Sequence, residues 1–327
     1  MKTVNWGIIG CGDVTEVKSG PGLYKAEHSR LLAVYNRTGE RARDYARRHG
    51  VDRVYESAEE LLADGEIDVV YIATPPNSHR DYALMTLKAG KIPYIEKPLT
   101  PSYEEAREIQ SLSKELGIPV YVAFYRRGLE KFLKIKELLD RGTIGPIRYI
   151  NITHTEPVKP VETDKKTQPW RVKPEISGGG KFLDMAVHVL DCLALFFGEF
   201  ESMEGHVQNL GGYYGADDTI SAVFRFKSGL CGAGNWCFVA DKQENEVQII
   251  GEKGRIVYDG MSVKEFRLIL DGKEKTYQFE KPEHIAMPYE QALVYEILGQ
   301  KKSHADFDQA LSLTKVMSSL LAVYYKP

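Results

Sequence analysis

The stretch "WGIIGCGDV", residues 6–14, decides the fold because an apolar run ends in two glycines, at positions 10 and 12. Such glycines let the backbone turn tightly and bring its N–H groups close to a diphosphate at the start of a helix. The third position of the G-x-G-x-x-G pattern is Thr15. We predict dinucleotide binding here, and the alternative is a tight turn without a ligand. The residues concerned are Gly10, Cys11, Gly12, Asp13 and Val14.

Short apolar runs alternate with helical patterns over the first 125 or so residues. This alternation predicts parallel βαβ units, with helices on both faces of the sheet. We therefore expect residues 1–124 to form a dinucleotide-binding domain with a doubly wound parallel sheet, in a chain of the α/β class. The expected strands span residues 4–10, 31–36, 69–74, 93–96 and 120–124, and the expected helices span 40–49, 78–89 and 103–116.

The pattern changes after Tyr125. Helices are expected over about 129–141 and near 182–197, and residues 201–279 then alternate between apolar and polar. This period of two predicts antiparallel hairpins, with turns at 227–229 and 251–254. We expect residues 125–327 to form an α+β domain with a large open, mostly antiparallel sheet. A last helix is expected over 307–324, and the sequence leaves open which of the two domains it packs on.

Composition narrows the classes of function. The chain has 327 residues and a net charge of −3, which argues against general affinity for nucleic acid or anionic membranes. No leader precedes the first strand and no apolar run approaches the roughly 20 residues of a membrane span, so we expect a cytoplasmic protein. The four cysteines lack C-x-x-C spacing, which predicts reduced thiols and no metal site.

The segment "AVYNRTGER", residues 33–41, follows the expected second strand and bears on the choice of cofactor. A carboxylate at this point would bind a ribose 2′-hydroxyl, whereas a guanidinium accommodates a 2′-phosphate. The segment offers Asn36, Arg37 and Arg41 and no acidic residue at the strand end. We predict NADP(H) rather than NAD(H), and the alternative is a solvated arginine pair.

Two other expected strands end at Thr74-Pro75-Pro76-Asn77 and at Glu96-Lys97-Pro98. The carboxyl ends of strands in a doubly wound sheet open onto the ligand crevice, so we expect Lys97 to lie near a bound nicotinamide. Partial burial would lower the pKa of Lys97 and Glu96 would oppose that shift, which would prepare the amine for proton transfer. The alternative is an ordinary surface salt bridge.

The expected helix near 182–197 carries Asp184, His188 and Asp191, at positions i, i+4 and i+7. Residues at this spacing share one face of a helix. Histidine moves protons near neutral pH, and a neighbouring carboxylate orients its ring. The alternative is a surface or N-cap arrangement.

With "GIIGCGDV", "ATPPNSH", "EKP" and "SGGGKFLDMAVHVLD" in this order, the chain resembles the glucose–fructose oxidoreductase/inositol dehydrogenase family (Gfo/Idh/MocA). The resemblance spans essentially the whole chain. It implies a Rossmann domain followed by a domain whose open sheet often mediates homodimers or homotetramers. It also implies nicotinamide-dependent oxidoreduction of a sugar, a polyol or a related carbonyl compound.

The resemblance also implies roles for particular residues. Lys97 matches the family lysine beside the nicotinamide and the substrate hydroxyl, and the catalytic Asp and His fall on Asp184 and His188. Either Lys97 or His188 carries the proton, and the sequence does not say which. The matching residues of the cofactor cradle are Thr74, Pro75, Asn77, His79 and Glu96.

Further candidates lie elsewhere in the chain. Trp170-Arg171 is similar to a family Trp-Arg pair near the cofactor, and the alternative is a packed Trp with a snorkelling Arg. Tyr125 and Tyr289 are candidates for the substrate site. The segment Lys18-Ser19-Gly20-Pro21 departs from the family pattern, adding either a cation to the site or only a kink.

We therefore predict an NADP(H)-dependent oxidoreductase in which Lys97 and His188 form the proton relay. One rival is an enzyme that keeps its dinucleotide bound and uses transient oxidation to cleave glycosides or epimerise them. A second rival is a non-enzymatic NADP(H) sensor. The presence of Lys97, Asp184 and His188 argues against the sensor, which needs no proton relay.

Overall fold

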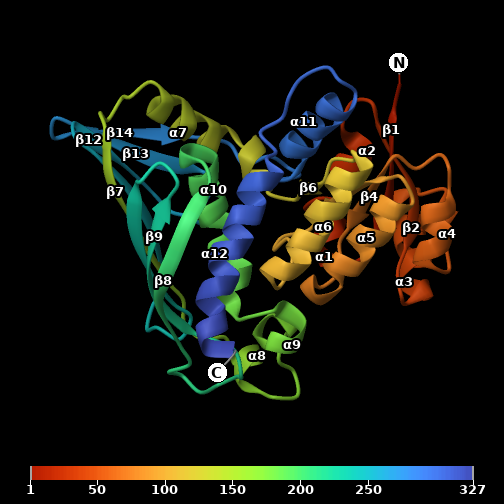
Figure 1. Ribbon diagram of the computed structural model, residues 1–327, viewed down its shortest axis with the longest axis horizontal. Coiled ribbons are helices and arrows are strands. Elements are labelled where there is room, and N and C mark those ends of the chain that lie inside the picture. Colours follow the sequence, from red (N-terminus) through yellow and green to blue (C-terminus); the bar gives the residue numbers. More distant parts are fainter. Residues whose placement is uncertain (1, 326–327) are drawn as a thin grey trace. The chain divides into compact units, whose positions relative to one another are not determined.

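The computed structural model describes residues 2–325 (Figure 1), which divide into two compact units. The first unit holds residues up to 100, 104–129 and 282–307. The second unit holds residues 101–103, 130–281 and those from 308 onward. The expected first domain ended at residue 124 and the expected second domain began at residue 125. The sequence analysis therefore did not foresee that residues 282–307 belong to the first unit.

The first unit is built on a parallel sheet of six strands in the order β3-β2-β1-β4-β5-β6. This order confirms the predicted doubly wound sheet, and the direction of winding reverses between β1 and β4. The two-residue strand β3 was missed because so short a segment carries no periodicity. The strands are β1 (Val4–Ile9), β2 (Ser29–Tyr35), β3 (Arg53–Val54), β4 (Val69–Ile72), β5 (Ile92–Ile95) and β6 (Tyr121–Val122).

Helices connect these strands, and those over residues 39–49, 79–88 and 103–116 confirm the amphipathic helices expected from sequence. The α-helices are α1 (Asp13–Val17), α2 (Gly22–Lys25), α3 (Gly39–His49), α4 (Ala58–Ala63), α5 (His79–Lys88), α6 (Tyr103–Leu116) and α11 (Met287–Ile297). Two 3₁₀ turns, η1 (Pro76–Ser78) and η2 (Tyr125–Gly128), follow β4 and β6.

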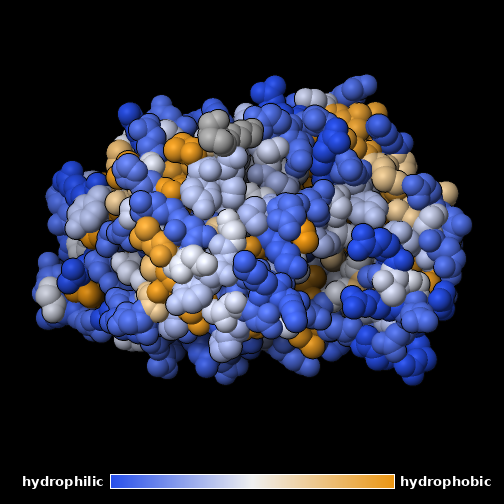
Figure 2. Space-filling model, turned by 90° about the horizontal axis from the view of Figure 1, so that it is seen from below, coloured by the Kyte–Doolittle hydropathy of each residue, from blue (hydrophilic) through white to orange (hydrophobic). Residues whose placement is uncertain are grey.

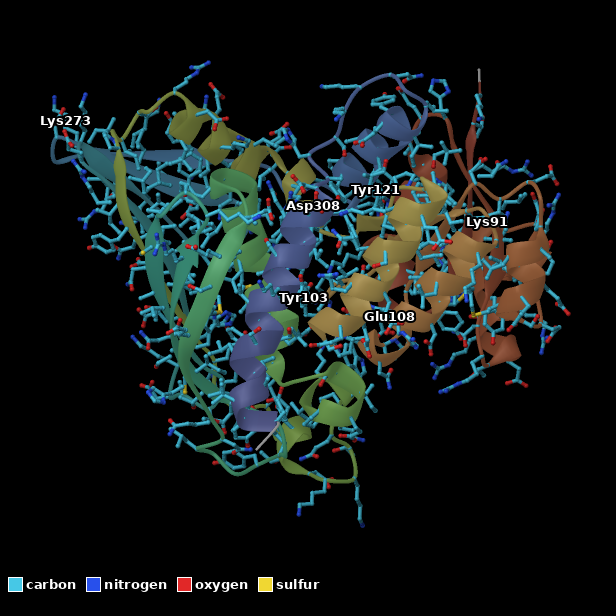
Figure 3. The ribbon with its side chains drawn as sticks, in the orientation of Figure 1. Lys91, Tyr103, Glu108, Tyr121, Lys273 and Asp308 are labelled. Atoms are coloured by element: carbon cyan, nitrogen blue, oxygen red, sulfur yellow. The ribbon has the colours of Figure 1, made fainter. Side chains whose placement is uncertain are left out.

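Helix α11 belongs to the first unit because specific contacts hold it there. The Tyr289 hydroxyl donates to the carbonyl of Val122 at 3.0 Å, and the Ala286 N–H donates to the carbonyl of Lys18 at 3.2 Å. Tyr121, labelled in Figure 3, places its hydroxyl 3.4 Å from Glu296. These long-range contacts connect the late segment to β6 and to the loop after α1.

The second unit contains an eight-stranded sheet in the order β14-β13-β12-β11-β7-β10-β9-β8. Only β7 and β10 pair in parallel among its described strands, which confirms the predicted mostly antiparallel sheet. The strands are β7 (Ile147–Thr155), β8 (Phe200–Gln208), β9 (Thr219–Phe226), β10 (Cys231–Cys237), β11 (Glu244–Gly251), β12 (Gly254–Tyr258), β13 (Glu265–Leu270) and β14 (Lys273–Gln278).

Helices α10 and α12 lie along one face of this sheet (Figure 1). Strand β9 shows the resulting asymmetry, since Ile220 and Phe224 are buried while Val223 between them is 60% exposed. The last helix, which the sequence left open between the domains, therefore belongs to the second unit. The helical segments are α7 (Glu130–Asp140), α8 (Pro160–Thr163), η3 (Trp170–Val172), α9 (Pro174–Ser177), η4 (Phe182–Ala186), α10 (Val187–Phe197) and α12 (Phe307–Tyr325).

Figure 2 shows one face of the molecule, on which hydrophilic residues predominate and hydrophobic residues form small separate groups. Across residues 2–325, no helix combines the length and the apolar character that a bilayer crossing requires.

Candidate active site

The glycine loop after β1 has one position at which the fold requires glycine and one at which it leaves room for a side chain. Gly10 has φ of +101°, and an added Cβ there would lie 2.8 Å from the carbonyl oxygen of Ala73. Gly12 has φ of −109°, and an added Cβ would meet nothing within 4 Å. The first glycine therefore permits the close approach of β1 and β4. The second has open space beside it, as binding of a ligand to the backbone requires.

Thr15 occupies the place of the third glycine, and the chain accommodates it locally. Its side chain is fully buried, and its hydroxyl donates to the carbonyl of Gly12 at 2.7 Å. A Cβ on Gly20 would lie 1.9 Å from the Thr15 carbonyl oxygen and 2.5 Å from the Tyr45 hydroxyl. Gly20 thus supplies the close contact behind the loop, and α1 ends at Val17.

Cys11 is buried within the loop. Burial raises the pKa of its thiol to about 12, and the nearby carboxylate of Glu16 adds to the shift. The side chain is therefore a neutral thiol at physiological pH, so any role that Cys11 has at a bound diphosphate falls to its backbone.

Arg37, in the loop after β2, and Arg41, on α3, make no ion pair with any residue in the range 2–325. Arg37 and Arg41 are both exposed. By contrast, Arg43 on the same helix is 2.9 Å from Glu56, and Arg48 is 2.7 Å from Glu16. Asn36 accepts the N–H of Thr38 at 2.8 Å and fixes the turn that presents these arginines.

His79 joins the two loops that follow β4 and β5. Its ring is fully buried, with Nε2 2.8 Å from the carbonyl oxygen of Thr74 and Nδ1 2.9 Å from that of Pro98. Burial lowers the pKa of His79, although the carbonyl groups oppose this. The histidine is thus a positioning residue inside the fold, whereas Pro75 and Asn77 of the same motif are exposed.

The side chain of Glu96 fixes the backbone of Lys97. Its carboxylate accepts a 2.6 Å hydrogen bond from the Tyr71 hydroxyl and a 3.1 Å bond from the N–H of Lys97. The same Tyr71 hydroxyl lies 2.8 Å from the hydroxyl oxygen of Ser19. Lys97 is half-buried, and its peptide bond to Pro98 is cis. The loop bearing Lys97 is therefore tied to the loop after α1.

The two candidate substrate tyrosines have different surroundings in the first unit. Tyr125, in η2, has the ammonium of Lys18 4.6 Å from the centre of its ring. Tyr289 is 1% exposed and donates to the carbonyl of Val122, which places it in the core. Sequence alone could not separate this interior position from a substrate position, because a buried tyrosine on a helix has the same local pattern in both.

The segment with Asp184 and His188 is not one regular helix. A π-helical turn over Phe182–Ala186 precedes the α-helix α10, which begins at Val187. Single π-helical turns occur frequently at functional sites, and the sequence carried no signal for this one. Asp184, His188 and Asp191 are 7%, 6% and 1% exposed. The helix is buried on all sides, so burial alone does not distinguish a catalytic face.

Residues of two separate sequence motifs meet in the second unit. Arg171 donates from Nε to the Asp184 carboxylate at 3.0 Å, and its guanidinium lies 4.6 Å from the centre of the Trp170 ring. The Arg171 side chain is 50% exposed, whereas that of Asp184 is 9% exposed. Arginine therefore fixes and neutralises a buried carboxylate, an arrangement that the two motifs did not reveal when considered separately.

Sequence reasoning missed the residues that hold the glycine loop before this helix. Asp217 accepts the N–H of Gly180 and the hydroxyl of Tyr325, both at 2.6 Å, and burial raises its pKa to about 6. Lys181 is buried and lies 3.2 Å from both Glu156 and Glu162. These partners come from distant parts of the chain, so no local motif could identify them.

Comparison with known protein families covers both halves of the chain. Residues 4–124 match an oxidoreductase family with an NAD-binding Rossmann fold, and residues 132–257 match the GFO/IDH/MocA C-terminal domain. The chain belongs to the Gfo/Idh/MocA family. Membership confirms the resemblance seen in the sequence. It also makes the protein an oxidoreductase of the dehydrogenase and reductase type, acting on hydroxyl or carbonyl groups.

Relatives of this Gfo/Idh/MocA protein match it over most of their length. Oxidoreductase P35 of Formosa agariphila is 38% identical over 320 residues, covering 96% of this chain and 97% of the relative. Myo-inositol 2-dehydrogenase of Thermotoga maritima is 28% identical over 274 residues, covering 82% and 78%. A structure of levoglucosan dehydrogenase with NADH and levoglucosan has a TM-score of 0.86 at 21% identity, covering 99% and 98%, and shows the shared fold.

The two glycines of this Gfo/Idh/MocA protein should respond differently to alanine. Gly10→Ala should lower the free energy of unfolding by about 1–3 kcal/mol, because the new side chain meets the Ala73 carbonyl at an unfavourable φ. Gly12→Ala is the matched control and should change the free energy of unfolding by less than about 0.5 kcal/mol. Urea denaturation measures both values, and equal losses in the two variants would contradict the assignment.

Proposed function

We propose that the protein is an NADP(H)-dependent oxidoreductase that transfers hydride between nicotinamide and a sugar, a polyol or a related hydroxyl or carbonyl compound. The observation that carries the proposal is the common position of three loops in the first unit. The loops that begin at Gly10, Thr74 and Glu96 all follow parallel strands and so share one edge of the sheet. This edge binds ligands in doubly wound folds.

The residues at this edge fit a phosphorylated dinucleotide. The backbone from Gly10 to Val14 would hold the diphosphate, because the space beside Gly12 is open. Arg37 and Arg41 would hold the 2′-phosphate, with Asn36 fixing their turn. Thr74, Pro75 and Asn77 would line the cofactor, while His79 and Glu96 position their loops. When bound, the nicotinamide supplies the acceptor or donor of hydride.

The chain itself supplies the proton transfer that accompanies hydride transfer. In oxidation, the amine of Lys97 or the imidazole of His188 takes the proton from the substrate hydroxyl, and in reduction it returns a proton to the carbonyl oxygen. Asp184, held by Arg171, would orient the imidazole or bind a neighbouring hydroxyl. Trp170 and Arg171 are assigned to the cofactor, and Tyr125 is assigned to the substrate.

The substrate class is supported by the relatives. Those named above include a dehydrogenase named for the polyol myo-inositol and another solved with levoglucosan. The levoglucosan enzyme was solved with NADH, so likeness to it does not decide between the two dinucleotides. The case for NADP(H) therefore rests on this chain's own Arg37 and Arg41.

We also propose that the protein forms a homodimer or homotetramer through the open face of the second-unit sheet. Tyr149 on β7 and Val223 on β9 are 53% and 60% exposed there, and both line one shallow depression. Exposed apolar side chains grouped in this way are typical of protein interfaces. The cytoplasmic location stays a prediction.

Replacing Arg37 with alanine should change the preference for cofactor. Loss of a charge-assisted contact to the 2′-phosphate should lower kcat/KM for NADP(H) by about 10- to 100-fold and leave that for NAD(H) nearly unchanged. Arg43→Ala is the matched control, because Arg43 lies six residues further on, in α3, but pairs with Glu56. A clear preference of the unaltered protein for NAD(H) would overturn the NADP(H) assignment.

Replacing Lys97 with methionine, or His188 with alanine, should lower kcat by about a hundredfold to ten-thousandfold, as expected for loss of a general acid–base. A panel of sugars, inositols and diols, scored by the absorbance of reduced nicotinamide, provides the assay. Lys88→Met removes an exposed lysine of the same unit and should leave kcat unaltered. Near-normal turnover in both the Lys97 and the His188 variant would remove the proposed proton relay.

A further inference from the structure

Lys18 is a positive charge held against an aromatic ring without a carboxylate partner. Its ammonium lies 4.6 Å from the centre of the Tyr125 ring, and within residues 2–325 it makes no ion pair or side-chain hydrogen bond. The side chain is only half-buried, so solvent or a ligand reaches it. A partly desolvated ammonium of this kind favours an anion as its neighbour.

Two further cations belong to the same cluster in the first unit. The guanidinium of Arg126 lies 5.9 Å from the centre of the Tyr125 ring, and Arg126 is 2% exposed. Burial alone would raise the pKa of Tyr125, but the pKa is lowered because Arg126, Lys18 and Lys97 favour the phenolate. The surroundings of the Tyr125 side chain are therefore strongly electropositive.

No carboxylate among residues 2–325 forms an ion pair with Lys18, although the charge of Lys18 acts on the carboxyl group of Glu290. Glu290, on α11, is fully buried, and neither of its oxygens has a hydrogen-bond partner among the described residues. Burial raises its pKa well above 4.5 and the charge of Glu96 adds to the shift, while the charge of Lys18 opposes it. Glu96 is engaged with Tyr71 and with the backbone of Lys97.

The position of this cluster distinguishes it from the part of the first unit assigned to the 2′-phosphate of the cofactor. The residues assigned to the 2′-phosphate, Arg37 and Arg41, follow β2, whereas Lys18 and Arg126 group with Lys97, which follows β5. Lys97 is the residue assigned to the substrate hydroxyl. An anion held by Lys18 beside Lys97 would therefore belong to the substrate and not to the 2′-phosphate.

We propose that Lys18 and Arg126, which both lie near the ring of Tyr125, form a subsite for the carboxylate of the substrate, so that the enzyme acts on sugar acids such as uronates or aldonates. The inference rests on the proposed function and narrows its substrate class. A carboxylate carries one negative charge, which balances the single unpaired charge of Lys18. A guanidinium and an ammonium together supply several donors to its two oxygens.

Calorimetric titration of the purified protein tests the subsite without requiring turnover. The probes are matched pairs that differ in the acidic group: glucose with glucuronate, galactose with galacturonate, and sorbitol with gluconate. At least one acid should bind about 10- to 100-fold more tightly than its neutral partner. Added salt should weaken binding of that acid and leave its neutral partner unaffected.

Variants of Lys18 assign the effect to this residue. Lys18→Met keeps the apolar stem over Tyr125 and should abolish the preference for the acid, whereas Lys18→Arg should restore it. The Kd for NADPH should stay the same in both variants, because the 2′-phosphate is assigned elsewhere. Lys88→Met is the control for loss of a lysine charge from the same unit. Melting temperatures show whether each variant is folded. If a variant does not fold, the salt dependence of binding to the unaltered protein still tests the subsite.

The outcomes separate this inference from the proposed function. Equal binding of acid and neutral probes, tighter binding of glucose 6-phosphate than of every carboxylate, or no effect of Lys18→Met would overturn the subsite. Tight binding of an acid that is lost in Lys18→Met would support the subsite even if no nicotinamide were reduced. The absence of nicotinamide reduction would contradict the proposed oxidoreduction and not the subsite.

Discussion

The first unit depends on the close approach of two backbones at the point where the parallel sheet reverses its winding. Gly10 lies against the carbonyl of Ala73 at a positive φ that disfavours a side chain. This contact lets β1 and β4 lie side by side and brings their following loops to one edge of the sheet. Residues that are 64 positions apart in sequence, such as Gly10 and Thr74, thereby face one ligand edge.

Buried polar groups then fix the loops at that edge. His79 links the loop after β4 to the loop after β5, and Glu96 links the latter to Ser19 through Tyr71. A buried polar group without its partner costs about 1–3 kcal/mol, so each of these contacts restricts the loops to one arrangement. The second unit uses the same principle, since Asp217 and Lys181 hold the glycine loop ahead of Asp184.

The sequence predicted the elements whose signals are local. Helix α6 begins and ends at the expected residues 103 and 116, because its amphipathic pattern is long and Gly117 stops it. The loops at Gly10, Thr74 and Glu96 were also predictable, since each follows an apolar strand. The short strand β3 and the π-helical turn over Phe182–Ala186 were not, because two residues carry no period and a π turn has no distinctive composition.

Contacts across long separations lay beyond sequence reasoning for a different reason. The pairing of Arg171 with Asp184 and the return of residues 282–307 to the first unit depend on tertiary packing. The segment Lys18-Ser19-Gly20-Pro21 was recognised only as a departure from the family pattern. In the structure Gly20 lies close to the carbonyl of Thr15, and the ammonium of Lys18 lies 4.6 Å from the centre of the Tyr125 ring.

The most direct test of the account is transfer of deuterium from substrate to cofactor. A sugar or polyol that the protein oxidises would be labelled with deuterium at the carbon bearing the reacting hydroxyl, and the nicotinamide would be analysed by mass spectrometry. The account predicts that reduced NADP carries the deuterium. Deuterium that stays on the substrate or passes into water, with the cofactor unlabelled, would contradict direct hydride transfer.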